Sequence, residues 1–142
     1  MKLLIVEDDY IQAKYIEENL MELLNNATIK RISTESQFYD FLEIMNEDKP
    51  DVILLDIMLR WTNPSPTMPE MPENVKEEGF HWAGIRCENK LRKMGVGKTI
   101  PVIIYSVIEK NTYSKFVNPE KTKFLNKDFD MQNLRNLILK FK

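Results

Sequence analysis

Two short runs of consecutive apolar residues constrain the fold of this chain more than any other feature. They cover residues 3–6 in MKLLIVEDD and 52–55 in DVILLDIMLRW, and each runs directly into carboxylates. A third run, VIIY, covers residues 102–105. Strands with one exposed face alternate between apolar and polar residues, so runs as continuous as these indicate strands that are covered on both faces. The chain therefore needs helices on either side of a central sheet.

Helical patterns occupy most of the chain between these runs. The predicted helices cover residues 10–24, a segment after Thr34, 79–94 and 130–141. Asp9 is the expected N-cap of the first helix, and Thr34 with Gln37 forms a capping box before the second. Gly95 follows the third helix as a natural C′ residue.

The fold class follows from this alternation of strands and helices. Two further strands, 28–32 (TIKRI) and 122–125 (TKFL), are alternating or weak, as expected at sheet edges. The first strand extends over 2–6. We expect an α/β fold with five parallel strands in the order 2-1-3-4-5 and helices on both faces, a doubly wound, flavodoxin-like sheet. Residues 108–120 lack a clean apolar stripe, so a helix there is expected to be short or distorted.

Acidic residues follow the two central strands at the point where each one ends. In such a sheet ligands bind beyond the carboxyl ends of the strands, where the strand order reverses. Glu7, Asp8 and Asp56 should therefore converge in one cleft. Two carboxylates about 5 Å apart repel by roughly 3 kcal/mol at an effective dielectric constant of about 20. A hard divalent cation, Mg²⁺ or Mn²⁺, would relieve this repulsion.

Ser106 and Lys127 are predicted to lie at the same edge of the sheet. Serine offers a hydroxyl group, and lysine is a compact cation that binds phosphate. Together with the acids they suggest a phosphoryl-transfer site in which Asp56 forms an aspartyl phosphate.

The bulk properties exclude several other classes of protein. The 142 residues suit a single domain over 1–142, and the formal net charge of −2 gives no basic field for nucleic acid. No apolar run is long enough to span a membrane. Cys87 is the only cysteine, which fits a reducing, cytoplasmic setting.

Four segments in the right order resemble the receiver domain of two-component response regulators (CheY-like). They are LLIVEDD, DVILLDIML, IPVIIYS and KFLNKDF. The resemblance implies that Asp56 is the phosphoacceptor, that Lys127 binds the phosphoryl group, and that Ser106 and Phe124 form the switch. It also implies that Mg²⁺ is held by Glu7, Asp8, Asp56 and the backbone carbonyl of Met58.

The same resemblance implies partners and a mechanism. A histidine kinase or histidine phosphotransfer protein would donate the phosphoryl group, and an unknown downstream protein would read the altered surface. The chain would catalyse only its own phosphorylation and dephosphorylation, so we do not expect an enzyme with a separate substrate. No DNA-binding output domain is expected after the last helix, although the chain could equally be excised from a larger protein.

The sequence departs from the family pattern at several positions. Residues 60–78, called the proline-rich segment below, hold four of the seven prolines and form an insertion between the third strand and the third helix. We expect this segment to act as a flap or docking arm beside Asp56. Arg60 and Asp128 occupy positions where the family usually has proline, and Val107 stands where a small residue is common.

These departures leave an alternative function open. A pseudo-receiver would keep the fold as an interaction module and would not be switched by phosphorylation. A phosphatase with an aspartyl nucleophile is disfavoured, because Met58 occupies the position of the additional acid and cannot donate a proton.

Overall fold

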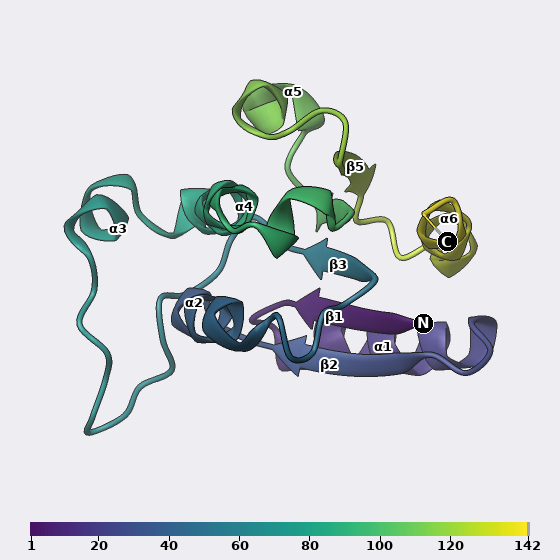
Figure 1. Cartoon of the computed structure of the whole chain (residues 1–142), viewed down its shortest axis with the longest axis horizontal. Coiled ribbons are helices and arrows are strands. Elements are labelled where there is room, and N and C mark those ends of the chain that lie inside the picture. Colours follow the sequence, from purple (N-terminus) through teal and green to yellow (C-terminus); the bar gives the residue numbers. More distant parts are fainter. Residues whose placement is uncertain (142) are drawn as a thin grey trace.

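A five-stranded parallel sheet forms the centre of the computed structural model, which describes residues 1–141. The strands are β1 (Lys2–Val6), β2 (Thr28–Ile32), β3 (Val52–Leu55), β4 (Val102–Ser106) and β5 (Thr122–Asn126). They lie in the order β2-β1-β3-β4-β5, and each neighbouring pair is parallel (Figure 1). The predicted α/β fold and strand order are confirmed.

Helices connect the strands. They are α1 (Tyr10–Leu23), α2 (Glu35–Ile44), α3 (Glu73–Glu78), α4 (Ala83–Lys93), α5 (Lys110–Tyr113) and α6 (Met131–Leu139). Short 3₁₀ turns cover Phe80–Trp82, Val96–Thr99 and Ser114–Phe116. The four-residue α5 confirms that the helix expected within 108–120 is short. No helix in residues 1–141 is long and apolar enough to cross a membrane.

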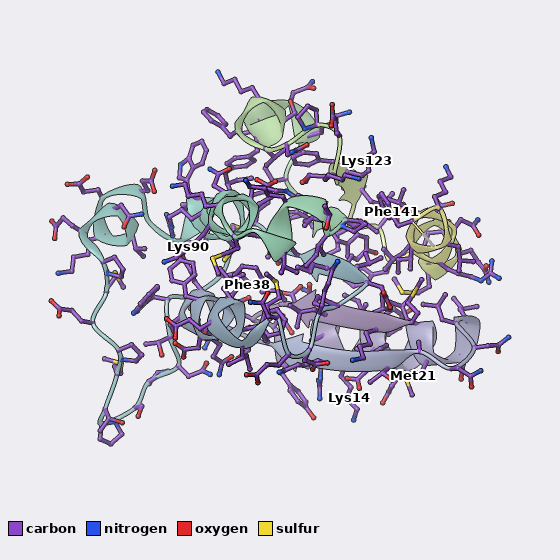
Figure 2. The ribbon with its side chains drawn as sticks, in the orientation of Figure 1. Lys14, Met21, Phe38, Lys90, Lys123 and Phe141 are labelled. Carbon is purple, nitrogen blue, oxygen red and sulfur yellow. The ribbon has the colours of Figure 1, made fainter. Side chains whose placement is uncertain are left out.

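Two clusters of buried side chains show which helices cover which face of the sheet. Leu3 and Ile5 of β1 pack with residues of α1 and α6, whereas Leu4 and Val6 pack with residues of α2, α4 and α5. This alternation is the two-residue period of a strand. The side chains fill the space between the helices and the sheet, including that of Phe38 in α2, which is fully buried (Figure 2).

The strand positions follow the predicted division into centre and edge. Every residue of β3 and β4 is buried, whereas β2 and β5 are partly exposed. The two outer strands each have one neighbour and one open edge, so polar residues are tolerated there. The central strands are apolar except at their ends, and the acids begin at the carboxyl ends of β1 and β3.

The predicted helix over 79–94 is wrong in its first turn. Gly79 has φ +81° and ψ −179°, a conformation that disfavours L side chains, and its N–H closes α3 on the carbonyl of Val75 (2.8 Å). Phe80–Trp82 then form a 3₁₀ turn, and α4 begins at Ala83. The expected role of Gly95 is also wrong, because its φ of −52° is right-handed and Met94 ends the helix in an extended conformation.

The predicted caps are largely confirmed. Asp9 accepts hydrogen bonds from the N–H groups of Ile11 (2.9 Å) and Gln12 (3.1 Å). Thr34 caps α2 through the N–H of Gln37 (3.2 Å). The return bond of the capping box differs, because the Gln37 side chain accepts from the N–H of Ser33, one residue before the cap.

The proline-rich segment begins as an extended loop without helix or strand and ends in α3 (Figure 1). Its first residues dock on the start of α2, where the carbonyls of Arg60 and Trp61 accept from the N–H groups of Glu35 (3.0 Å) and Ser36 (2.9 Å). The indole of Trp61 donates to the carbonyl of Pro69 (3.1 Å). The segment is therefore tied to α2 at one end and folded back on itself.

Candidate functional site

The ends of β1 and β3 place two acids side by side. The N–H of Glu7 donates to the carbonyl of Ile32 (3.0 Å), and the N–H of Asp56 donates to the carbonyl of Val6 (3.0 Å). The backbone of each acid is thus held by the hydrogen bonds of the sheet, and each acid is the first residue after its strand. The predicted convergence of the acids at this edge follows from the register of the strands.

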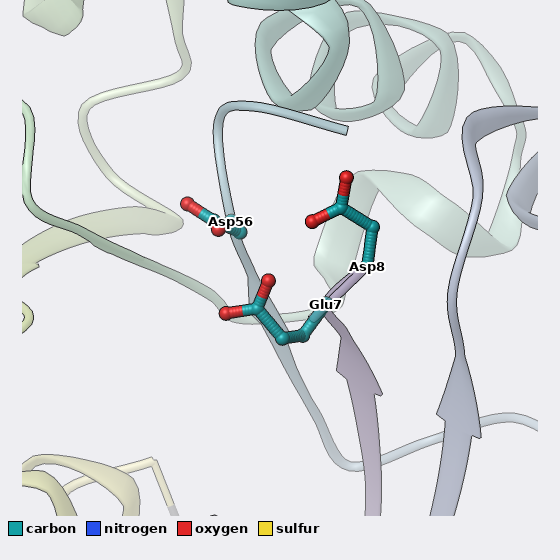
Figure 3. Close-up of side chains that lie close together, drawn as sticks. All are labelled: Glu7, Asp8 and Asp56. Carbon is teal, nitrogen blue, oxygen red and sulfur yellow. The ribbon is translucent and has the colours of Figure 1, made fainter. Parts of the chain in front are cut away.

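Glu7, Asp8 and Asp56 form one carboxylate cluster (Figure 3). One oxygen from each residue lies within 4.8 Å of the others. Glu7 and Asp56 are buried, and Asp8 is half-buried. An all-oxygen donor set of three carboxylates fits a hard divalent cation such as Mg²⁺ or Mn²⁺. The part played by the Met58 carbonyl stays a prediction.

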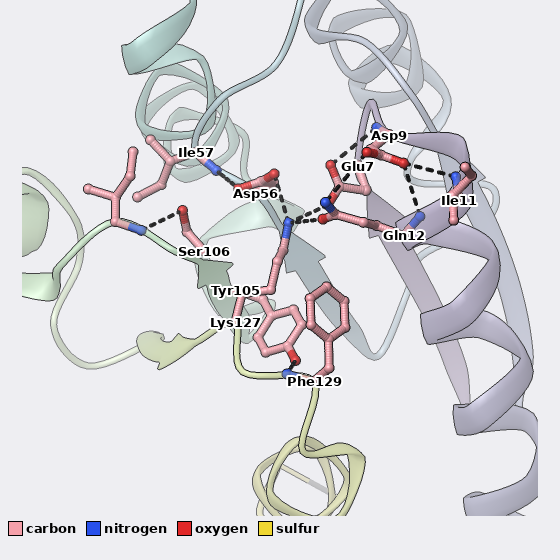
Figure 4. Close-up of polar contacts among 11 residues, drawn as sticks. Glu7, Asp9, Ile11, Gln12, Asp56, Ile57, Tyr105, Ser106, Lys127 and Phe129 are labelled. Atoms are coloured by element: carbon pink, nitrogen blue, oxygen red, sulfur yellow. Dashed lines mark hydrogen bonds and ion pairs between the residues drawn. The ribbon is translucent and has the colours of Figure 1, made fainter.

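Lys127 provides the nearest positive charge (Figure 4). Its Nζ donates to Asp56 Oδ2 (3.0 Å), to Gln12 Oε1 (2.9 Å) and to Glu7. Its backbone N–H donates to the carbonyl of Ser106 (2.9 Å), which fixes the lysine beside the end of β4. The sequence prediction that acids and lysine meet at one edge of the sheet agrees with this geometry.

Burial and charge shift the protonation of two groups in the site. Burial, reinforced by the negative charge of Asp56, raises the pKa of Glu7 to about 7 despite the nearby lysine. Burial alone would lower the pKa of Lys127, but the charges of Asp56 and Glu7 outweigh it and raise that pKa above its usual value. The lysine therefore stays charged, and the repulsion between the acids favours a proton on Glu7.

The Asp56 carboxylate is also held by the next backbone N–H, and α4 packs against the backbone of Asp56 and Ile57. Its Oδ1 accepts the N–H of Ile57 (2.8 Å), and the N–H of Gly84 donates to the carbonyl of Ile57 (2.7 Å). A Cβ atom on Gly84 would lie 2.2 Å from the carbonyl oxygen of Asp56. Only glycine allows α4 to approach the end of β3 this closely.

Ser106 and Phe124 line a common cavity of about 630 Å³ on the side of β4 and β5 where α5 lies. The Ser106 hydroxyl is buried and accepts the N–H of Ile108 (3.3 Å), and the Phe124 ring is half-buried. Val107 also lines this cavity and is 62% exposed. The two residues predicted to form the switch thus lie beside one open space.

The residues that depart from the family pattern take defined positions. The backbone N–H of Arg60 donates to Asp8 Oδ2 (3.2 Å), and its Nε lies 3.7 Å from the same oxygen. Asp128 does not pair with Lys127; its Oδ1 accepts the N–H of Asp130 (2.9 Å) within a turn. No cis peptide bond occurs between residues 1 and 141, so the peptide bond before Asp128 is trans.

Sequence reasoning missed one residue of this site and one buried network beside it. Gln12 faces Lys127 from the first turn of α1, and its only signal is its place three residues after the Asp9 cap. Arg86 in α4 forms a two-point ion pair with Glu35 in α2 (2.8 Å for each bond) and also reaches Glu78 in α3 (3.3 Å). This network joins the proline-rich segment to the body of the protein.

The two tryptophans pack against different helices. Trp61 packs edge-on against Tyr39 of α2, with 5.6 Å between ring centroids. Trp82 packs against Tyr113 and Phe116 at 4.8 and 5.1 Å.

Comparison with known proteins identifies the fold. No family model and no curated protein matches the sequence. Among solved structures, the CheY-like response regulator receiver domain from Methylobacillus flagellatus matches with a TM-score of 0.69 and 22% identity, over 100% of this chain and 98% of that one. The chain has the receiver-domain fold.

Two other receiver-fold structures bear on the site. The receiver domain of the sensor histidine kinase PA1611 from Pseudomonas aeruginosa, solved with magnesium coordinated in its active-site cleft, has a TM-score of 0.67 and 17% identity over 99% of this chain and 95% of that one. The phosphorylated cyanobacterial phytochrome response regulator RcpA has a TM-score of 0.65 and 18% identity over 96% and 87%. Identities this low establish the receiver-domain fold alone.

Proposed function

We propose that this chain is a phosphorylation-dependent signalling switch that accepts a phosphoryl group on Asp56. The observation that carries the proposal is the contact between Lys127 and Asp56 inside a cluster of three carboxylates. A buried acid that is paired with one cation, and lies beside two further acids, is suited to divalent metal and to phosphoryl oxygens. The magnesium-bound and phosphorylated receiver domains of similar fold support the same reading.

The residues of the chain divide the chemistry among them. Glu7, Asp8, Asp56 and the Met58 carbonyl would hold Mg²⁺ or Mn²⁺, which supplies positive charge to the phosphoryl oxygens when bound. An Asp56 oxygen forms the new bond to phosphorus as the bond to the donor histidine nitrogen breaks, and the electron pair stays on that nitrogen. Lys127 stabilises the negative charge that gathers on the phosphoryl oxygens.

Ser106 and Phe124 would carry the signal away from the site. The Ser106 hydroxyl turns toward the new phosphoryl oxygen and gives up its contact with the N–H of Ile108. Phe124 then rotates into the cavity that both residues line. The surface of α5 and β5 changes, and a downstream protein binds the changed surface.

The partners and setting follow from this chemistry. The phosphoryl donor is a histidine kinase or a histidine phosphotransfer protein, and the chain acts on no separate substrate. A reducing, cytoplasmic location fits the single buried Cys87. We assign no direct nucleic-acid or membrane role, and we expect signalling through protein contact.

Intact-protein mass after incubation with acetyl phosphate and Mg²⁺ tests the proposal. We expect a gain of one phosphoryl group in the wild type and none in Asp56→Asn or in a chelated sample. Acetyl phosphate can fail where a cognate donor succeeds, so beryllofluoride is added as a second probe. Absence of both the adduct and any Mg²⁺-dependent response to beryllofluoride would refute the switch.

A pseudo-receiver is the second candidate, and the contacts of Asp8 favour it. The Arg60 side chain approaches Asp8, one of the three acids that would hold metal, with 3.7 Å between Arg60 Nε and Asp8 Oδ2. If this contact excluded metal, the protein would keep its fold as an interaction module without a switch. Mg²⁺ titration of the wild type and Arg60→Ala separates the two candidates, because a pseudo-receiver of this kind would gain metal binding only in the variant.

A further inference from the structure

The turn that carries Lys127 is held by two consecutive residues of β4. Strand β5 ends at Asn126, so residues 127–130 lie outside the sheet. The carbonyl of Ser106 accepts the N–H of Lys127 (2.9 Å). The hydroxyl of Tyr105 accepts the N–H of Phe129 (3.0 Å) (Figure 4). Neither hydrogen bond involves the reacting groups, yet both fix the backbone on which the lysine stands.

Phe129 adopts a conformation that needs such support. Its φ of +60° lies in the left-handed region, which is unfavourable for residues other than glycine. Besides the hydroxyl of Tyr105, two rings hold it there: Tyr105 at 6.4 Å and Tyr15 at 5.7 Å between centroids, both edge-on. The turn is thus kept in shape by an aromatic cluster on the α1 and α6 face of the sheet.

Tyr105 also lies directly beside the lysine and its acids. It is 2% exposed, and together with Lys127, Glu7 and Asp56 it surrounds a void of only about 10 Å³. A void of this size leaves no room for the Lys127 side chain to adopt another conformation. The tyrosine ring therefore limits where the lysine stem can run, and the hydroxyl fixes the turn two residues further on.

We propose that Tyr105 is a positioning residue that sets the location of the Lys127 ammonium group relative to Asp56. The inference rests on the proposed function and deepens it, because it assigns the placement of the phosphate-binding lysine to a residue outside the site. Tyr105 contacts neither metal nor phosphoryl group in this assignment. It acts through the backbone of Phe129 and through packing beside the lysine.

Tyr105→Phe is the first test, since it removes the hydroxyl and keeps the ring. The matched control is Tyr113→Phe, because the buried Tyr113 also makes one hydrogen bond with the backbone, to the carbonyl of His81 (3.0 Å) on the other face of the sheet. The initial rate of Asp56 phosphorylation by acetyl phosphate is measured at saturating Mg²⁺, and Mg²⁺ affinity is measured separately.

We expect Tyr105→Phe to lower the phosphorylation rate by roughly 3- to 10-fold, the range that one neutral hydrogen bond supports. Mg²⁺ affinity and the rate of Tyr113→Phe should stay at the wild-type level. In a Lys127→Ala background the additional change Tyr105→Phe should have no further effect, since there is no lysine left to position. An unchanged rate, or an equal loss in both backgrounds, would overturn the assignment.

Two readouts need no phosphorylation and keep this inference separate from the proposed function. Amide hydrogen exchange of Phe129 should accelerate in Tyr105→Phe, and crystal structures should place Lys127 Nζ beyond hydrogen-bond distance of Asp56. If the wild type shows neither the phosphoryl adduct nor a response to beryllofluoride, the proposed function fails while these readouts still decide the positioning. An undisplaced lysine in the variant would then refute it.

Discussion

Gly84→Ala tests the close contact between α4 and the end of β3. The added Cβ would lie 2.2 Å from the carbonyl oxygen of Asp56 and 2.7 Å from Cα of Ile57. Non-bonded heavy atoms prefer about 3.5 Å, so helix and strand end must separate by roughly 1 Å. Both neighbours are backbone atoms, which cannot rotate out of the way.

The expected cost is that of overpacking a rigid core, about 2–3 kcal/mol of unfolding free energy. In a chain of this size that corresponds to a fall in melting temperature of about 8–12 °C. The hydrogen bond from the N–H of Gly84 to the carbonyl of Ile57 should lengthen as well. Because Asp56 moves with this backbone, Mg²⁺ affinity should fall at a temperature where the variant is fully folded.

Two other glycines provide matched controls for thermal unfolding and Mg²⁺ titration. A Cβ on Gly97 would lie 2.1 Å from the carbonyl oxygen of Leu91, outside the carboxylate cluster, so Gly97→Ala should lose stability and keep Mg²⁺ affinity. A Cβ on Gly95 meets nothing within 4 Å and its φ is −52°, so Gly95→Ala should lose nothing. Wild-type stability in Gly84→Ala would refute the proposed steric clash. Equal Mg²⁺ affinity in all three variants would show that the packing of α4 does not affect the carboxylate cluster.

Three further predictions concern groups around the site. Arg86→Met should cost about 3–5 kcal/mol in chemical denaturation because it leaves Glu35 buried without its partner, and adding Glu35→Leu should recover most of that loss. The pKa of the Glu7 carboxyl is raised from 4.5 to about 7 in the folded, metal-free protein, so between these pH values only the folded state holds the proton of Glu7. The free energy of unfolding, measured in chelator, should therefore fall as pH rises through that window, and Glu7→Gln should lack this pH dependence. Trp61→Ala should speed proteolysis of the proline-rich segment, since the indole bond to Pro69 is lost, and an unchanged cleavage rate would show that the other contacts suffice.

The positions of the acids and of Lys127 could be predicted because they depend on strand ends. A continuous apolar run such as 52–55 predicts a buried strand, and a parallel sheet brings the residues after such strands to one edge. The positions of Asp56 and Glu7 could therefore be predicted without knowledge of any side-chain contact. The order of the strands followed from the weakness of the edge strands 28–32 and 122–125.

The first turn of the helix predicted over 79–94 could not be placed in this way. Phe80, His81 and Trp82 fit a helical pattern, but the left-handed φ of Gly79 is a property of the folded backbone. Nothing in the local sequence separates a glycine that precedes a helix from one that redirects the chain. The turn is decided by packing, since Trp82 contacts Tyr113 in a later helix.

The polar residues that were missed depend on tertiary neighbours that a sequence pattern does not contain. Gln12 and Arg86 lie on helices where a polar residue is ordinarily exposed. Arg86 is only 8% exposed because Glu35, 51 positions earlier, supplies both of its principal hydrogen bonds. Such pairs can be recognised only after two helices have been placed against each other.

The site combines acids that follow the strands of the sheet with cations that come from outside it. Glu7 and Asp56 are fixed by the ladder of the sheet, and Gly84 leaves Asp56 no room to shift toward α4. Lys127 and Arg60 reach the acids through long side chains from segments outside the sheet. A change in charge at Asp56 would therefore be balanced by these two cations and by the backbone that carries them. This makes the turn after β5 and the start of the proline-rich segment two further places, besides α5 and β5, where a change at Asp56 would alter the surface.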